Sequence, residues 1–166
     1  MSEPSNAPPP PRPRRPRRLI PLVLFGVALV GMALGVRALT TPARGEDQVD
    51  WRHDFQAGVD AASAADKPLL LYFGADWCPP CLELRARVFS QDHVADTIEQ
   101  RFVPVKIDLT DPNATQQQLA QRYEAQYIPL LVIADAEGTP LTRYNGGLSA
   151  DNLLQWLDQG APSASP

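Results

Sequence analysis

The two cysteines of the chain stand three residues apart, in the segment Cys78-Pro79-Pro80-Cys81. A thiolate, not a thiol, attacks a disulfide, and a cysteine that starts a helix in a C-x-x-C motif can have its pKa lowered from about 8.5 to roughly 3.5–7.5. The second cysteine, one helical turn later, can resolve the mixed disulfide that the first one forms. The spacing therefore predicts thiol–disulfide exchange, with Cys78 as the nucleophile and Cys81 as the resolving cysteine.

A zinc site and a structural disulfide are the competing interpretations of this motif. Zinc needs two further ligands, and the two histidines, His53 and His93, are far apart in sequence and lack a paired spacing. A disulfide that closes so short a loop removes little entropy from the unfolded chain, so it stabilises a fold poorly. We therefore expect no metal, and no cofactor other than the redox-active Cys78–Cys81 disulfide.

Charge is distributed unevenly along the 166 residues. From Glu46 to the end there are eight Lys and Arg against eighteen Asp and Glu, a net charge of minus 10. Phosphate binding needs clustered cations, so this acidic portion excludes nucleic acid as a partner.

The first 39 residues are typical of a membrane anchor. Residues 1–18 are rich in Pro and Arg and contain no aromatic or β-branched residue, which predicts a disordered segment. Residues 19–36 carry no charge, and a helix over 19–39 would be about 31 Å long, enough to cross a bilayer. Five arginines between Arg12 and Arg18 precede it, so the positive-inside rule places the N-terminus in the cytoplasm.

We accordingly expect a single-pass signal anchor over residues 19–39 in a bacterial inner membrane, with the remainder of the chain in the periplasm. Secretion to the periplasm after cleavage of a signal peptide is the alternative. Residues 40–50 are expected to be a linker, and residues 161–166 a disordered tail.

Strand and helix patterns alternate between residues 51 and 160. The first expected elements are a helix carrying Phe55, Val59 and Ala62, a strand over 69–73, a helix from Leu82 to Phe89 continued from Val94, and a strand over 102–107. A helix follows that is opened by a Thr115–Gln118 capping box and carries Leu119, Tyr123 and Tyr127. The last expected elements are a strand over 130–134, a turn over 135–138, an edge strand over 141–144, and a final helix N-capped by Ser149. This order predicts an α/β domain with a central mixed sheet flanked by helices.

Three segments together resemble the thioredoxin superfamily: Ala75–Cys81 after an apolar strand, Ile128-Pro129 before a second strand, and Gly146-Gly147 before the last helix. The resemblance covers about residues 51–160 and implies a thioredoxin fold.

Other segments, Lys67–Leu71, the helix reaching Phe89-Ser90, and Val105–Thr110, are most similar to the C-terminal domain of the transmembrane reductase DsbD and related single-domain proteins. This similarity implies a reductase of disulfides in periplasmic proteins, supplied with electrons by a membrane protein. We also expect the protein to be a monomer, held at the membrane by its N-terminal helix.

The resemblance also implies how clients bind. Pro129 would be a cis proline opposite the motif, and the backbone of Ile128 would hydrogen-bond a docked peptide. Trp77, Pro79 and Pro80 would shape the lip around the first cysteine.

Two positions depart from the family pattern. Family members commonly have a buried acidic residue six positions before the first cysteine, where this chain has Tyr72, and DsbD-like domains have an acidic residue where Arg85 stands. The usual proton acceptor for the second cysteine is therefore missing, and Asp76 and Glu83 are the nearby carboxylates that could replace it.

Three other functions remain open from the sequence. Cytochrome-c-maturation thioredoxins share the Trp-Cys-Pro-Pro-Cys signature but carry an inserted strand and helix, for which this chain lacks room. The same motif also serves disulfide oxidases and isomerases, whose potentials differ from those of reductases. A thioredoxin-fold chaperone that binds clients without turnover is the non-enzymatic alternative, although such modules typically lack one cysteine.

Overall fold

The computed structural model describes Gly45 and residues 47–160. The predicted disordered segment 1–18, the membrane span 19–39 and the tail 161–166 lie outside the described residues. Within the described part of the chain, no helix has the length and apolar character needed to cross a membrane.

A four-stranded sheet in the order β2-β1-β3-β4 forms the centre of the domain. Strand β1 (Leu69–Gly74) pairs in parallel with β2 (Val103–Asp108) and antiparallel with β3 (Leu130–Ala134), and β3 pairs antiparallel with β4 (Pro140–Asn145). Every residue of β1 and β3 is buried, as their uninterrupted apolar sequences predict for strands covered on both faces. The predicted mixed sheet is confirmed.

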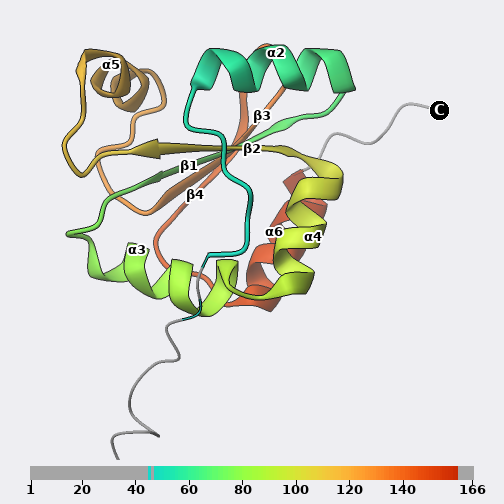
Figure 1. Ribbon diagram of the computed structural model, residues 1–166, viewed down its shortest axis with the longest axis vertical. Helices are drawn as coiled ribbons and strands as arrows, with labels where there is room; N and C mark the ends of the chain where they lie inside the picture. The colour runs from blue at the N-terminus through green and yellow to red at the C-terminus, as the bar shows by residue number, and fades with distance from the viewer. Residues whose placement is uncertain (1–44, 46, 161–166) are drawn as a thin grey trace, which may run out of the picture. The chain divides into compact units, whose positions relative to one another are not determined.

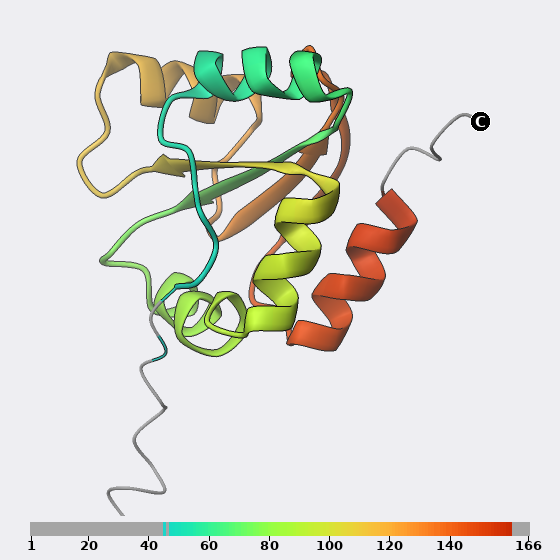
Figure 2. The ribbon, with the colours of Figure 1, turned by 45° about the vertical axis from the view of Figure 1, so that its right-hand side comes forward.

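Helices cover both faces of this sheet (Figures 1 and 2). Helices α2 (Phe55–Ala65) and α5 (Ala114–Arg122) lie on one face. The other face is covered by α3 (Pro79–Leu84), its π-helical continuation η1 (Arg85–Phe89), α4 (Asp92–Arg101) and α6 (Ala150–Gly160).

Alternation along β1 divides its side chains between two hydrophobic clusters. Leu70 and Tyr72 belong to the cluster that includes residues of α3, η1, α4 and α6, such as Leu84. Leu69, Leu71 and Phe73 belong to the cluster on the side of α2 and α5. Tyr72 therefore lies beneath the helix that begins at the cysteine motif.

The structure differs from the sequence prediction at residues 47–50, expected as part of a linker. Val49 is only 6% exposed and Trp51 only 8%, and both belong to the cluster beneath α3. The Gln48 amide donates to the Phe89 carbonyl over 2.9 Å, and Arg52 forms a parallel bridge with Val105 at the edge of the sheet. The packed domain therefore begins at residue 47 or before, because the apolar side chains of this segment complete the core.

The capping box of α5 also lies elsewhere than predicted. Asn113, not Thr115, is the N-cap: its side chain accepts from the Gln116 amide over 3.0 Å, and the Gln116 side chain accepts from the Asn113 amide over 2.8 Å. The helix ends at Arg122, so the prediction that Tyr127 belongs to its apolar face is wrong. The predicted cap of the last helix is confirmed, because the Asn152 amide donates to Ser149 Oγ over 3.3 Å.

Candidate active site

The cysteine motif opens helix α3 at the end of the central strand. Cys78 is the N-cap residue, and Pro79 and Pro80 occupy the first turn, where a helix has no use for their missing amide protons. The Cys81 amide donates to Cys78 Sγ over 3.3 Å. The two cysteines form a disulfide with their Cα atoms 5.3 Å apart. A backbone N–H directed at the first sulfur stabilises negative charge there, so the local fold favours a Cys78 thiolate.

Both sulfurs are covered by neighbouring loops. Cys78 is 3% exposed and Cys81 is fully buried, and they form a small cluster with Ala75 against which Leu109 and Ile128 pack. The carbonyl oxygen of Ile128 lies 3.6 Å from Cys78 Sγ. The Ile128–Pro129 peptide bond is cis, as the family resemblance predicted.

The loop after β2 braces the segment that precedes Cys78. Thr110 Oγ1 accepts a hydrogen bond from the Asp76 amide over 2.9 Å and donates one to Asp108 Oδ1 over 2.6 Å. The Trp77 indole N–H donates to the Thr110 carbonyl over 3.3 Å. Thr110 was not among the predicted site residues. Its position in the sequence could have identified it, because Thr110 follows β2, which pairs in parallel with β1, the strand before the cysteine motif. Parallel neighbours end at the same edge of the sheet, so the residues that follow them lie close together.

This contact also affects the ionisation of Asp108. Burial favours its neutral form, but hydrogen bonds from the Thr110 hydroxyl and amide, with the charges of Lys106 and Arg85, outweigh that effect and hold the pKa of Asp108 below its ordinary value. The carboxylate is thus a charged anchor for the loop.

Two aromatic side chains project into solvent beside the motif. Trp77 is 64% exposed, at the lip where the sequence predicted it, and Tyr127 is 77% exposed, immediately before the cis peptide. Large exposed aromatic groups are typical of protein-binding surfaces. Tyr127 was missed as a site residue because its spacing from Tyr123 also fits a helix.

The carboxylates considered as proton acceptors are both paired with arginines. Asp76 Oδ1 lies 2.8 Å from Arg85 Nη1, and Glu83 Oε1 lies 3.1 Å from Arg87 Nη1. Both side chains are 62% exposed, whereas Cys81 is fully buried. Neither carboxylate therefore takes the place of the buried acid that the family pattern implies.

Arg85 also faces a carboxylate from the segment before the first helix. Asp47 Oδ2 lies 4.0 Å from Arg85 Nε, and both Asp47 oxygens accept from the Trp51 indole N–H, at 3.0 and 3.1 Å. Burial raises the pKa of Asp47, although the Val49 amide, the Trp51 indole and Arg85 partly offset it. An acidic group is thus present near the motif, but it comes from a part of the sequence that the family pattern does not include.

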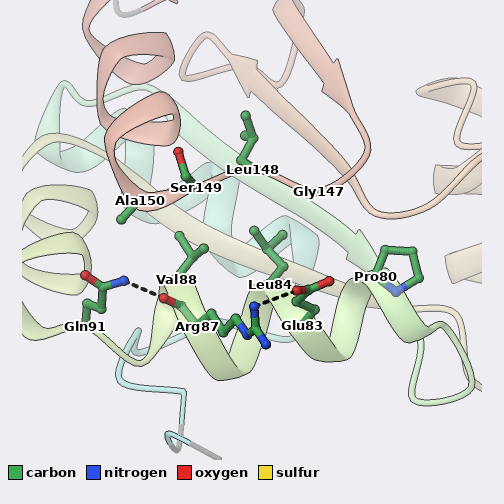
Figure 3. Close-up of a pocket in the computed structure, with 10 residues that line it drawn as sticks. All are labelled: Pro80, Glu83, Leu84, Arg87, Val88, Gln91, Gly147, Leu148, Ser149 and Ala150. Atoms are coloured by element: carbon green, nitrogen blue, oxygen red, sulfur yellow. Dashed lines mark hydrogen bonds and ion pairs between the residues drawn. The ribbon is translucent and has the colours of Figure 1, made fainter. Parts of the chain in front are cut away.

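A groove of about 490 Å³ runs from the motif along α3 and η1 (Figure 3). Leu84 and Val88 are buried at its base, and the ion pair of Glu83 and Arg87 lies on its rim. The full lining is Pro80, Glu83, Leu84, Arg87, Val88, Gln91, Gly147, Leu148, Ser149 and Ala150. The groove therefore connects the motif to the loop before α6, where the Gly146-Gly147 segment lies.

The described domain is similar to known thioredoxin-like proteins. The family model described as a thioredoxin-like domain matches residues 55–161. The thiol:disulfide interchange protein DsbD of Vibrio vulnificus (strain CMCP6) is 31% identical over 108 residues, which are 64% of this chain and 18% of that protein. The chain therefore corresponds to less than a fifth of the length of this relative.

Two further proteins extend the comparison. The chloroplastic thioredoxin Y1 of Arabidopsis thaliana is 28% identical over 118 residues, which are 71% of this chain and 62% of that protein. The crystal structure of the Neisseria meningitidis DsbD C-terminal domain in the oxidised form has a TM-score of 0.57 and 28% sequence identity, and the match covers 66% of this chain and 98% of that one. The resemblance to the DsbD C-terminal domain is therefore confirmed in both sequence and fold.

Proposed function

We propose that this chain, which belongs to the family of thioredoxin-like domains, reduces disulfides of periplasmic proteins. It carries the Cys78–Cys81 pair of a thiol–disulfide oxidoreductase. The observation that carries the proposal is the Cys81 amide directed at Cys78 Sγ, because it identifies the sulfur that is prepared to be a thiolate.

The reaction transfers two electrons from the enzyme dithiol to the client disulfide. Cys78 thiolate attacks one client sulfur, the client S–S bond breaks, and the departing client thiolate takes up a proton. Cys81 then loses its proton and attacks Cys78 Sγ, which releases the second client thiolate and leaves the enzyme disulfide. Cys78 keeps a small exposed surface, 3%, and Cys81 has none, so a client sulfur meets Cys78 first.

Client binding would use the surface around Cys78. Trp77 and Tyr127 offer exposed aromatic contacts, and an extended client segment could hydrogen-bond the backbone of Ile128 beside the cis Pro129. Pro79 and Pro80 are exposed and lack amide protons, so they present an apolar lip without unpaired donors.

Similarity to DsbD favours the reducing direction and an electron donor in the membrane. A signal anchor over residues 19–39, with the N-terminus in the cytoplasm, would hold the domain on the periplasmic face of the inner membrane, where such a donor could reach it. These statements on anchoring, donor and clients belong to the proposal.

The reduction potential of the full-length chain, purified in detergent, tests the proposed direction. The protein is equilibrated with dithiothreitol or glutathione buffers of known poise, and the oxidised fraction is read by thiol alkylation. A potential near that of thioredoxin, about −270 mV, would support a reductase, whereas one near about −120 mV would identify an oxidase. A Cys81→Ser variant should accumulate mixed disulfides with clients, and Cys78→Ser should not. Failure of the wild-type disulfide to form reversibly would refute the redox function itself.

A further inference from the structure

Tyr72 carries a buried hydroxyl group that the redox reaction proposed above does not use. The side chain is fully buried, and within the described part of the chain its hydroxyl has no hydrogen-bond partner. Native proteins rarely leave a buried polar group unpaired, because an unmade hydrogen bond costs the full desolvation of the group. An unpaired buried hydroxyl is available to bond a group that another state of the molecule supplies.

The hydroxyl points along β1 toward the cysteine motif. The Tyr72 ring packs against Trp51 and Phe89, with ring centroids 5.5 and 5.2 Å apart. Its oxygen reaches over Gly74, two residues nearer the motif, so closely that a Cβ on Gly74 would collide with it.

Helix α3 starts at the cysteine motif and packs on the same face of the sheet as Tyr72, through Leu84. Cys81 and Leu84 are three residues apart, so they lie on the same face of the helix, and both are buried against the sheet. Leu84 belongs to the same cluster as Tyr72, whereas Cys81, one turn nearer the start of the helix, packs with Ala75. The end of the Tyr72 side chain that carries the oxygen is therefore the end nearer Cys81.

The charged groups around the base of the motif are already engaged. Asp47 accepts from the Trp51 indole, Asp76 pairs with Arg85, and Asp108 accepts from Thr110. Burial raises the pKa of Tyr72 well above its ordinary value, so the phenol keeps its proton and can donate it in a hydrogen bond.

We propose that the Tyr72 hydroxyl donates a hydrogen bond to Cys81 Sγ in the dithiol form, and that this bond is absent from the disulfide form. Reduction of the enzyme disulfide takes up two electrons and, with Cys78 as a thiolate, one proton on Cys81, and it leaves Cys81 with a free sulfur that can accept a hydrogen bond. The proposal rests on the Cys78–Cys81 couple of the proposed function, but not on the direction in which that couple works.

The hydroxyl then stabilises the reduced form relative to the oxidised form. Tyr72→Phe removes an unpaired group from the disulfide form and a paired group from the dithiol form, so both effects shift the equilibrium toward the disulfide. We expect the equilibrium constant for reduction to fall about tenfold, which corresponds to a potential ~30 mV more negative for a two-electron couple.

The test measures the potentials of wild type, Tyr72→Phe and Tyr123→Phe in full-length protein equilibrated with dithiothreitol buffers. Tyr123 is a matched control: it is equally buried, but its hydroxyl lies on the other side of the sheet and donates to the Gly138 carbonyl over 2.6 Å. Tyr123→Phe should destabilise both redox forms alike and leave the potential unchanged. Thermal unfolding of both forms gives a second readout, in which Tyr72→Phe raises the Tm of the disulfide form and lowers that of the dithiol form.

An unchanged or less negative potential in Tyr72→Phe, with a reversible wild-type couple, would overturn this proposal and leave the proposed function intact. A Tyr72→Phe variant that fails to fold would also overturn it, because loss of an unpaired hydroxyl should not unfold the oxidised protein. A wild-type disulfide that does not equilibrate with dithiothreitol would remove the proposed function and this inference together.

Discussion

Replacement of Thr110 by valine should separate two contributions to the stability of the motif loop. Valine keeps the shape of the side chain but removes the hydroxyl, and with it the bond from the Asp76 amide at 2.9 Å and the bond to Asp108 at 2.6 Å. A neutral hydrogen bond contributes about 1 kcal/mol net and one to a charged acceptor about 1.5–3 kcal/mol. Because Thr110 is exposed, water replaces part of both, and we expect a total loss of about 1–2 kcal/mol at pH 7.

The loss should depend on pH in a defined direction. The pKa of Asp108 is lower in the folded protein than in the unfolded chain, where it is about 3.9. The ionised Asp108 carboxylate therefore stabilises the fold fully at pH values above the unfolded-state pKa, and this stabilisation is lost as the pH falls through the folded-state pKa. The difference between wild type and Thr110→Val should therefore be constant above about pH 5 and shrink at lower pH. The part due to the Asp76 amide should persist, since that bond does not titrate.

Urea unfolding of residues 42–166 between pH 7 and pH 3 measures both parts. Thr110→Ser keeps the hydroxyl and serves as the control, expected within about 0.5 kcal/mol of wild type. Equal free energies of unfolding for Thr110→Val and wild type at every pH would show that the hydroxyl does not stabilise the loop. A deficit that does not change with pH would show that it is not coupled to Asp108.

Two further predictions concern the cap of α5 and the membrane topology. Asn113→Ala should lose about 1 kcal/mol in urea unfolding, because it breaks the reciprocal bonds with Gln116, whereas Thr115→Ala should be nearly neutral; the opposite order would contradict the assigned cap. Alkaline phosphatase, which is active only outside the cytoplasm, should be active when fused after residue 166, and inactivity of that fusion would contradict the proposed orientation; a fusion after residue 18, which lacks the span, is the inactive control.

The elements that carry the motif were predictable because local sequence determines them. The apolar runs of β1 and β3 are long enough to need cover on both faces, and the C-x-x-C segment directly after β1 fixes the position of the cysteines. The cis bond before Pro129 was predicted by family resemblance alone, since few X-Pro bonds are cis.

The contacts around the motif were not predictable, because they join segments that are distant in sequence. The position of Thr110 just after β2 indicates that it lies near the motif, but not that its hydroxyl bonds the Asp76 amide, 34 residues away. Asp47 and Val49 lie in a short polar stretch typical of a linker, and only the tertiary structure shows that Val49 packs in the core and that Asp47 approaches Arg85. Side chains of this kind are placed by packing, which periodicity does not encode.

The two departures from the family pattern make sense as one change. A carboxylate at position 72 would be buried against the rings of Trp51 and Phe89, at a large desolvation cost unless it were paired. In this chain a neutral tyrosine occupies that place, and the carboxylates that face Arg85 come from Asp47 and Asp76 instead. Trp51 contacts both Tyr72 and the Asp47–Arg85 pair, since its ring packs on Tyr72 while its indole N–H donates to Asp47. Tyr72 and Arg85 are therefore best regarded as parts of one cluster, in which restoring an acidic residue at position 72 alone would not recreate the family arrangement.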